Sequence, residues 1–202
     1  MSLKHYLFLG DSITDAGHLW EADPRMLGDG FIRKISESTA FSSAHLVNRG
    51  QDGFTSAALL RLVRRMTDLD TFTTITVLIG VNDLPVAFYT DPTWIRTTFA
   101  PSVQALFELL TSAGSKKLLI MEPFLFTPPD SHSHLLPLLL QEQQILQAYA
   151  AACDAVYIPL QEALQAAIDR LGTAAVTTDG IHLTPAGNQI LADAWIRSCL
   201  RE

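Results

Sequence analysis

Thr73-Thr74-Ile75-Thr76-Val77-Leu78-Ile79-Gly80 is the stretch of this 202-residue chain that decides its fold. It is rich in β-branched residues and closes on a glycine, which is typical of a buried strand. Four shorter apolar runs predict the other strands: Tyr6–Gly10, Ala44–Asn48, Lys117–Glu122 and Val156–Ile158.

Helical patterns separate these runs. In Thr55–Met66 the apolar residues recur at spacings of three and four, with arginines on the other face. Further patterns are Val103–Leu110 after a start at Asp91-Pro92, Leu138–Ala152, Leu160–Leu171 and a last helix from Thr184-Pro185 to about Cys199. Strand followed by helix five times predicts an α/β fold with a five-stranded parallel sheet and right-handed crossovers.

The composition restricts the class of protein. With 48% hydrophobic and 17% charged residues, the chain suits one folded domain, which we expect to span residues 1–202. No apolar run reaches about 18 residues, so no transmembrane helix is expected. The net charge of −7 argues against a nucleic-acid surface and against an electrostatic membrane anchor.

The two cysteines and the N-terminal sequence indicate the compartment. Cys153 and Cys199 make no disulfide framework and are expected to pack between helices. The apolar part of the N-terminal stretch is only Tyr6–Leu9, and it leads straight into Gly10-Asp11-Ser12 without a signal-peptide cleavage pattern. We therefore expect a reduced, cytoplasmic protein.

Polar residues follow the predicted strands and loops in four places. They are Gly10-Asp11-Ser12, Asn48-Arg49-Gly50, Gly80-Val81-Asn82-Asp83 and Asp179-Gly180-Ile181-His182. In parallel α/β sheets, ligands bind outside the carboxyl ends of the strands. The four segments would bring a hydroxyl, a glycine N–H, a side-chain amide, a carboxylate and an imidazole to that edge. These are the parts of an acyl-transfer site.

Each of these residues has a plainer explanation when it is taken alone. Ser12 would serve as a helix cap, Gly50 as an ordinary turn glycine and Asn82 as a residue that holds a loop. Asp179 and His182 would form a turn beside a solvent-facing imidazole. What favours acyl transfer is that all of them fall at the one edge of the sheet where such folds bind ligands.

Other kinds of site fit the sequence less well. Asp11 and Asp15 would suit metal or glycoside chemistry only as a carboxylate pair, and His132 and His134 have no further ligands at suitable spacing. A non-catalytic flavodoxin-like module would bind FMN or phosphate in the loop around Ser12, which lacks the repeated Ser/Thr and Gly of a phosphate cradle.

Taken in order, the four segments resemble the blocks of the SGNH/GDSL esterase and lipase superfamily. Gly10-Asp11-Ser12-Ile13-Thr14-Asp15 matches the first block with Ile13 in place of the usual Leu, and Gly50 stands for the second. Gly80-Val81-Asn82-Asp83 matches the third block, and Asp179-Gly180-Ile181-His182-Leu183 matches the last. The resemblance implies a flavodoxin-like three-layer α/β/α sandwich that hydrolyses esters without metal or cofactor.

The same resemblance implies a role for each residue. Ser12 would be the nucleophile, His182 the general base and Asp179 the acid that orients it. The backbone N–H groups of Ser12 and Gly50, with the side-chain amide of Asn82, would form the oxyanion hole. The chemistry agrees, because a serine hydroxyl needs an adjacent base and a neutral imidazole, with an unperturbed pKa of about 6.5, can supply it.

The sequence indicates the substrate less sharply. The segment Ala16–Gly30 is similar to that of small microbial members that deacetylate xylan-type oligosaccharides. We expect a small-molecule ester, with acetyl esters of carbohydrates ahead of the substrates of a lysophospholipase- or thioesterase-type acylhydrolase. Aromatic residues such as Trp20 and Phe124 follow strand ends and would suit sugar rings or acyl groups equally. The run Leu135–Leu140 is either core or the interface of a homo-oligomer.

Overall fold

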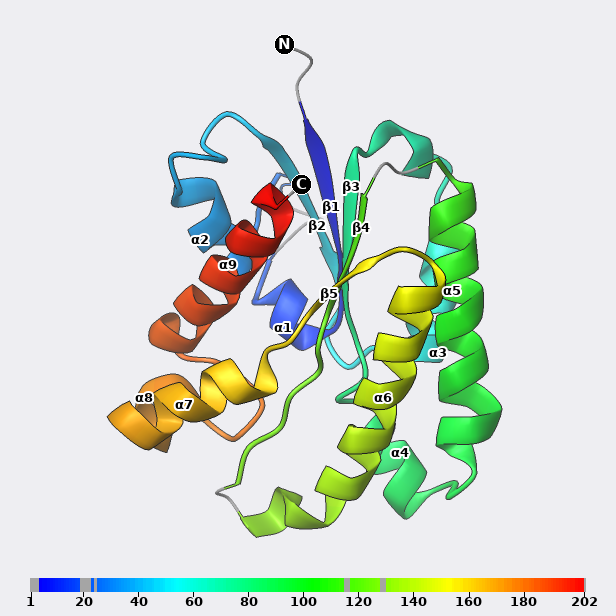
Figure 1. The fold of residues 1–202 in the computed structure, drawn as a ribbon, viewed down its shortest axis with the longest axis vertical. Coiled ribbons are helices and arrows are strands. Elements are labelled where there is room, and N and C mark those ends of the chain that lie inside the picture. The colour runs from blue at the N-terminus through cyan, green and yellow to red at the C-terminus, as the bar shows by residue number, and fades with distance from the viewer. Residues whose placement is uncertain (1–3, 19–22, 24, 115–116, 128–129, 202) are drawn as a thin grey trace.

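Five parallel strands form one sheet in the order β2-β1-β3-β4-β5 in the computed structural model (Figure 1). The strands are β1 (His5–Gly10), β2 (His45–Gly50), β3 (Thr74–Leu78), β4 (Lys117–Met121) and β5 (Val156–Ile158). All five predicted runs are confirmed as strands, and their ends differ from the predicted ones by no more than two residues. The structure describes residues 4–18, 23, 25–114, 117–127 and 130–201.

Helices cover both faces of the sheet and make the predicted α/β/α sandwich (Figure 1). One face carries α1 (Ser12–Asp15), α2 (Phe31–Glu37), α7 (Gln161–Leu171), α8 (Thr173–Val176) and α9 (Pro185–Leu200). The other carries α3 (Ser56–Val63), α5 (Ala100–Ser112) and α6 (Leu136–Ala152), while α4 (Asp83–Tyr89) follows the end of β3. Shorter turns are η1 (Leu69–Thr71), η2 (Ile95–Phe99) and η3 (Asp130–Leu135).

A hydrophobic core fills the space on each side of the sheet. Successive side chains of β1 alternate between the two cores, with Phe8 in one and Leu7 and Leu9 in the other. On α9, Trp195 is fully buried against Phe8, and its indole N–H donates to Thr76 Oγ1 at 2.9 Å. The alternation specifies the register of the strand, because a shift of one residue would move every side chain into the opposite core.

Two helical segments differ from the prediction. Asp83–Tyr89 forms α4, although Pro85 lies within it, because a proline in the first turn removes only an N–H that has no partner inside the helix. The helix expected from Asp91-Pro92 begins later, as the π-helical turn η2 that leads into α5.

The run Leu135–Leu140 contributes both to the core and to the surface. Leu135 and Leu139 are buried, whereas Leu136 and Leu140 are exposed.

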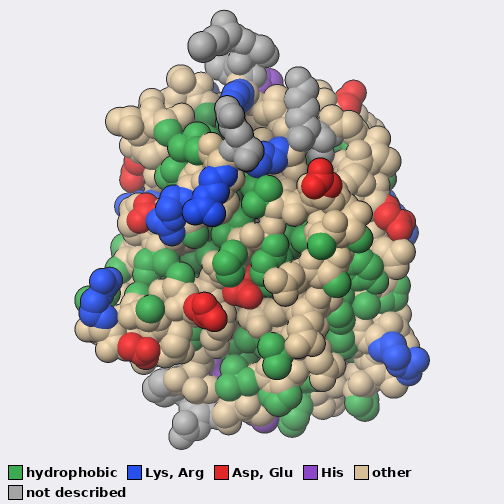
Figure 2. Space-filling view, in the orientation of Figure 1, with side chains coloured by type: hydrophobic (Ala, Val, Ile, Leu, Met, Phe, Trp, Pro, Cys, Tyr) green, Lys and Arg blue, Asp and Glu red, His purple; other side chains and the backbone are tan. Residues whose placement is uncertain are grey.

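Within the part of the chain that the structure describes, none of the helices has the length and hydrophobicity needed to span a membrane. On the face shown in Figure 2, acidic and basic side chains lie interspersed among polar and hydrophobic ones.

Candidate active site

Ser12 is placed at the edge of the sheet by the turn from β1 into α1. Asp11 is the N-cap of α1, and its carboxylate accepts the Ile13 N–H at 3.0 Å. Ser12 is therefore the first residue of the helix, and no acceptor for its N–H lies among the described residues. Backbone N–H groups at a helix start favour negative charge nearby.

His182 reaches Ser12 from the far end of the chain. The loop that carries it is closed by a bridge between Thr177 and Leu183, and the Thr177 hydroxyl donates to the His182 carbonyl at 2.8 Å. Gly180 turns the loop with a φ of 91°, and its carbonyl accepts the Phe126 N–H at 2.9 Å. These bonds hold the imidazole so that its Nε2 lies 3.0 Å from Ser12 Oγ.

Asp179 orients the imidazole from the other side. Its Oδ2 lies 2.6 Å from His182 Nδ1, and its Oδ1 accepts the N–H groups of Ile181 and His182 at 2.9 Å and 2.7 Å. Both side chains are about half exposed, at 48% for Asp179 and 50% for His182. Burial works against the charge of Asp179, but the hydrogen bonds from His182 and Ile181 outweigh it and lower the pKa of this carboxyl. Asp179 is therefore ionised at neutral pH.

The N–H of Gly50, which the sequence assigns to the oxyanion hole, already has a hydrogen-bond partner. This N–H is buried and donates to Asn48 Oδ1 at 2.8 Å. The glycine is needed for space instead, because an added Cβ would lie 2.2 Å from the Asp15 backbone nitrogen. Gly50 therefore lets α1 pack directly on the end of β2.

Asn82 lies between β3 and α4 with its side-chain amide turned toward the loop after β2. One Nδ2 hydrogen donates to the Phe54 carbonyl at 3.0 Å, which leaves the second hydrogen for another acceptor. Asp52 in the same loop donates its N–H to Asp15 Oδ2 at 3.1 Å. The loop after β2 thus runs between α1, which begins with Ser12, and Asn82.

Gly53 is a residue of this loop that the sequence reasoning missed. It has a φ of 71°, nothing within 4 Å of the place of its missing Cβ, and no acceptor for its N–H among the described residues. It neighbours Phe54, whose carbonyl Asn82 holds. In the sequence, Gly53 is simply a second glycine three residues after Gly50. The hydrogen bonds separate the two, because the Gly50 N–H is bonded to Asn48, whereas the Gly53 N–H has no acceptor among the described residues.

A family model described as the GDSL-like lipase/acylhydrolase family matches residues 8–190. That span holds Ser12, Asn82, Asp179 and His182 and makes up most of the chain.

The chain belongs to this family. It is therefore a carboxylic ester hydrolase, as its four sequence blocks predict.

Two similar proteins support the same fold. The acetylxylan esterase of Geobacillus stearothermophilus is 24% identical over 202 residues, which cover 95% of this chain and 91% of that protein. Its crystal structure matches with a TM-score of 0.83 at 22% identity, over 98% of this chain and 95% of that one. An α/β hydrolase from the metagenome of Lake Arreo, Spain, matches with a TM-score of 0.81 at 19% identity, over 98% and 97%.

Further crystal structures of the Geobacillus stearothermophilus esterase are described as catalytic mutants. In these mutants a serine, an aspartate and a histidine are each replaced by alanine. The TM-scores of these structures are 0.81 to 0.83 at 21–22% identity.

The hydrolase has a cavity of about 260 Å³ lined in part by residues next in sequence to Asn82 and His182. Val81, which precedes Asn82, lines one part of it, and Ile181, which precedes His182, lines another. Leu84, Pro85, Leu125 and Leu135 make most of the remaining wall apolar, while Tyr89 and His132 add polar atoms.

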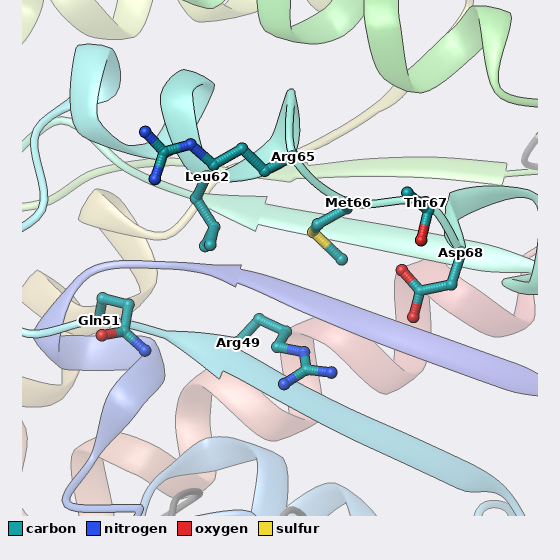
Figure 3. A pocket seen from close by; sticks show the side chains of 7 residues that line it. All are labelled: Arg49, Gln51, Leu62, Arg65, Met66, Thr67 and Asp68. Atoms are coloured by element: carbon teal, nitrogen blue, oxygen red, sulfur yellow. The ribbon is translucent and has the colours of Figure 1, made fainter.

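A second cavity, of about 330 Å³, lies on the other side of the loop after β2 (Figure 3). Arg49, Leu62, Met66 and Asp68 are among the side chains around it. Neither cavity is lined by Ser12, Asp179 or His182, but the first is lined by Val81 and Ile181, the sequence neighbours of Asn82 and His182, and is therefore the better placed of the two to receive an ester.

The remaining residues singled out from the sequence have structural roles. His134 lies 2.7 Å from the Tyr89 hydroxyl through its Nε2, so it does not face His132 across a metal site. Among the described residues, no three His, Cys, Asp or Glu side chains are arranged to hold a metal ion. Phe124 is fully buried, so it belongs to the core rather than to a substrate surface. Trp20 lies outside the described residues.

Proposed function

We propose that this hydrolase is a serine esterase that forms an acyl-enzyme on Ser12 and acts on short-chain esters, in particular acetyl esters of carbohydrates. The observation that carries the proposal is the chain of contacts from Ser12 Oγ to His182 Nε2 (3.0 Å) and from His182 Nδ1 to Asp179 Oδ2 (2.6 Å). A hydroxyl, an imidazole and a carboxylate in that order convert a weak nucleophile into a strong one.

The first half of the reaction transfers the acyl group to the enzyme. His182 Nε2 takes the Ser12 proton as Oγ bonds to the ester carbonyl carbon, and the carbonyl oxygen becomes an oxyanion. Asp179, ionised as described above, stabilises the imidazolium that forms. When the carbonyl returns, the carbon–oxygen bond to the alcohol breaks, and the imidazolium gives its proton to the leaving alcohol.

The second half releases the acyl group with water. His182 removes a proton from a water molecule, whose oxygen attacks the acyl carbon, and the second tetrahedral intermediate expels Ser12 Oγ. The imidazolium returns its proton to that oxygen, so the enzyme ends in its starting state. The products are a carboxylic acid and an alcohol, and neither half requires a cofactor.

The oxyanion of both halves would be bound by three N–H donors. We assign the backbone N–H groups of Ser12 and Gly53 and the second amide hydrogen of Asn82 to this role. Gly53 replaces Gly50 because the Gly50 N–H is already bonded to Asn48. Donors that face the charge only in the transition state lower the barrier without tightening substrate binding.

The preference for acetylated carbohydrates follows from the relative and not from the shape of the site. The Geobacillus stearothermophilus protein is an acetylxylan esterase, and it covers nearly the whole length of this chain. Its catalytic mutants replace the same three residue types that meet here in Ser12, Asp179 and His182. A homo-oligomer and a cytoplasmic location stay predictions from the sequence.

A lysophospholipase- or thioesterase-type acylhydrolase is the second candidate. It is favoured by the cavity of about 260 Å³, which is several times larger than an acetyl group and mostly apolar. Such a cavity would hold a longer acyl chain by burying it away from water. On the first proposal, the same cavity holds part of the alcohol.

The replacement of Ser12 by Ala tests the acyl-enzyme. Hydrolysis of p-nitrophenyl acetate should fall by about 10⁴-fold or more, because among the described residues Ser12 carries the hydroxyl that lies within hydrogen-bond distance of the His182 ring. Ser112→Ala, an exposed serine at the end of α5, is the matched control and should keep full activity. Activity of Ser12→Ala within tenfold of the unchanged protein, with the fold intact by circular dichroism, would remove Ser12 from the mechanism.

A series of esters separates the two substrate classes. We expect kcat/KM to be highest for acetyl among p-nitrophenyl esters of increasing chain length, and acetylated xylo-oligosaccharides to be deacetylated efficiently. A rise in kcat/KM of more than about tenfold from acetyl to octanoyl, with no release of acetate from the oligosaccharides, would favour the second candidate instead.

A further inference from the structure

Glu142, on the inner face of α6, is a buried acid that the mechanism above does not use. Its exposed fraction is 0%, and neither carboxyl oxygen has a hydrogen-bond partner among the described residues. Asp83 is also fully buried, but its carboxyl oxygens have hydrogen-bond partners. They accept the backbone N–H and hydroxyl of Ser56 and the indole N–H of Trp94 at 2.7–2.8 Å. A buried polar group without partners destabilises a fold, so its presence calls for an explanation.

The carboxyl group of Glu142 lies directly against the segment that carries Asn82. A Cβ added to Gly80 would lie 2.7 Å from Glu142 Oε2 and 3.3 Å from Pro123. Gly80 has a φ of 140°, and its carbonyl accepts the Asp83 N–H at 2.7 Å, which closes a turn over Val81 and Asn82. Glu142 and Pro123 therefore form the surface on which the turn Gly80–Asp83 rests.

The surroundings of Glu142 disfavour its charged form. Burial raises the pKa of Glu142 well above its ordinary value of 4.5, and the nearby charge of Asp83 raises it further. Five elements that pack against α6 carry further titratable groups. Arg96 on η2, Glu108 on α5 and Tyr89 on α4 are exposed, whereas Tyr157 on β5 and His132 and His134 on η3 are partly buried. The Tyr157 hydroxyl donates to Glu122, and His134 contacts the Tyr89 hydroxyl. No cation among them is placed to neutralise a carboxylate at Glu142.

We propose that Glu142 is a positioning residue for the oxyanion hole, which as an uncharged carboxylic acid supports the turn Gly80–Asp83 and so fixes the amide of Asn82. This inference rests on the proposed function, because it assigns an oxyanion to Asn82. Glu142 has no hydrogen bond to Ser12 or His182, and it meets the segment before Asn82 at Gly80. An oxyanion donor displaced by a fraction of an ångström loses much of its effect on the transition state.

A double-mutant cycle between Glu142 and Asn82 tests the proposal. Asn82→Ala should lower kcat by about 10²–10³-fold. Glu142→Ala should lower kcat about tenfold with KM within twofold, because the turn moves but the substrate is still bound. Added to Asn82→Ala, the Glu142→Ala change should cost less than about twofold more. An equal, multiplicative loss in both backgrounds, or a rise in KM with unchanged kcat, would overturn it.

A conservative variant covers the case in which Glu142→Ala does not fold. Glu142→Gln keeps the shape and the absence of charge, so kcat should stay within about threefold. Its melting temperature should exceed that of the unchanged protein by a margin that grows from pH 4 to pH 8. The reason is that the unfolded chain releases the Glu142 proton in this range while the folded chain keeps it. A margin that does not change with pH would show that Glu142 is charged, and would contradict the proposal.

Two further variants separate this inference from the proposed function. Glu162→Gln, at an exposed position of α7, is the matched control and should show no such growing margin. Ser12→Ala, measured in the same assay, reports on the proposed function: if it keeps activity, the acyl-enzyme fails. In that case the melting-temperature comparison still reports whether Glu142 is uncharged, because it does not depend on turnover, whereas its positioning role falls with the proposed function.

Discussion

Two aspartates stand at the same edge of the sheet, near the same reacting atoms, and differ in how readily they ionise. Asp179 contacts the imidazole of His182 and is about half exposed, and its pKa is lowered below the ordinary range. Asp11 precedes Ser12 and is 1% exposed, and burial raises its pKa to about 7.

The difference comes from the balance between donors and burial. Asp179 receives the ring and two backbone N–H groups while one side of it meets water. Burial raises the pKa of Asp11 most, and the nearby carboxyl of Asp83 raises it further; the Ile13 N–H, the His182 imidazole and its own backbone N–H lower it without outweighing the burial. The site therefore has a charged carboxylate at its rim and carboxyl groups beneath it that resist ionisation, which keeps negative charge away from the forming oxyanion.

The same substitution at the two positions should give opposite results, and this is the largest effect we expect from the comparison. Asp179→Asn removes the charge that stabilises the imidazolium and should lower kcat by about 10³–10⁴-fold. Asp11→Asn replaces a carboxyl that is mostly uncharged near neutral pH, and Asn still accepts the Ile13 N–H, so kcat at pH 6 should stay within about threefold. Initial rates on p-nitrophenyl acetate measure both.

The comparison would break if both variants lost activity to the same degree. Asp11 would then be charged in the working enzyme, and the balance of burial and donors described above would be wrong. Thermal melts of both variants are needed beside the rates, so that a loss of folded protein is not read as a loss of catalysis.

The fold was predictable because its signals are local. The β-branched run Thr73–Gly80 and the shorter apolar runs have the composition of strands buried on both faces, and the alternation of strands and helices predicts that they pair in parallel. α4 was not predicted because Pro85 argues against a helix in the sequence, although its place in the first turn makes it harmless.

The site was predictable only in part, because hydrogen bonds and protonation are properties of the folded chain. The spacing of Asp179 and His182 and the position of Ser12 after β1 suffice to bring the three together. Gly50 and Gly53 look alike in the sequence, and what separates them is the Asn48 side chain that accepts the Gly50 N–H. Likewise, the sequence does not show that the pKa is lowered for Asp179 and raised for Asp11.

The pH dependence of stability gives the smallest but most direct measure of the difference between the two aspartates. An acid whose pKa is raised on folding, as for Asp11 from 3.8 to about 7, keeps its proton in the folded chain after the unfolded chain has released it. Its contribution is therefore neutral below about pH 4, destabilises the fold increasingly up to about pH 7, and then stays constant. The contribution of Asp179 to stability has the opposite sign. Its lowered pKa stabilises the fold, and this stabilisation is lost only as the pH falls into the acid range.

The stability of Asp11→Asn should therefore increase relative to that of the unchanged protein as the pH rises. About three pKa units correspond to a stability difference on the order of 4 kcal/mol between pH 4 and pH 8, which for a chain of this length is a shift of roughly 10 °C in melting temperature. Asp179→Asn should show no such gain over that range, because the folded and unfolded chains both hold that group ionised above about pH 5. Melting temperatures of the three proteins at pH 4, 6 and 8 decide the matter: parallel curves for Asp11→Asn and the unchanged protein would mean that the buried carboxyl is charged after all.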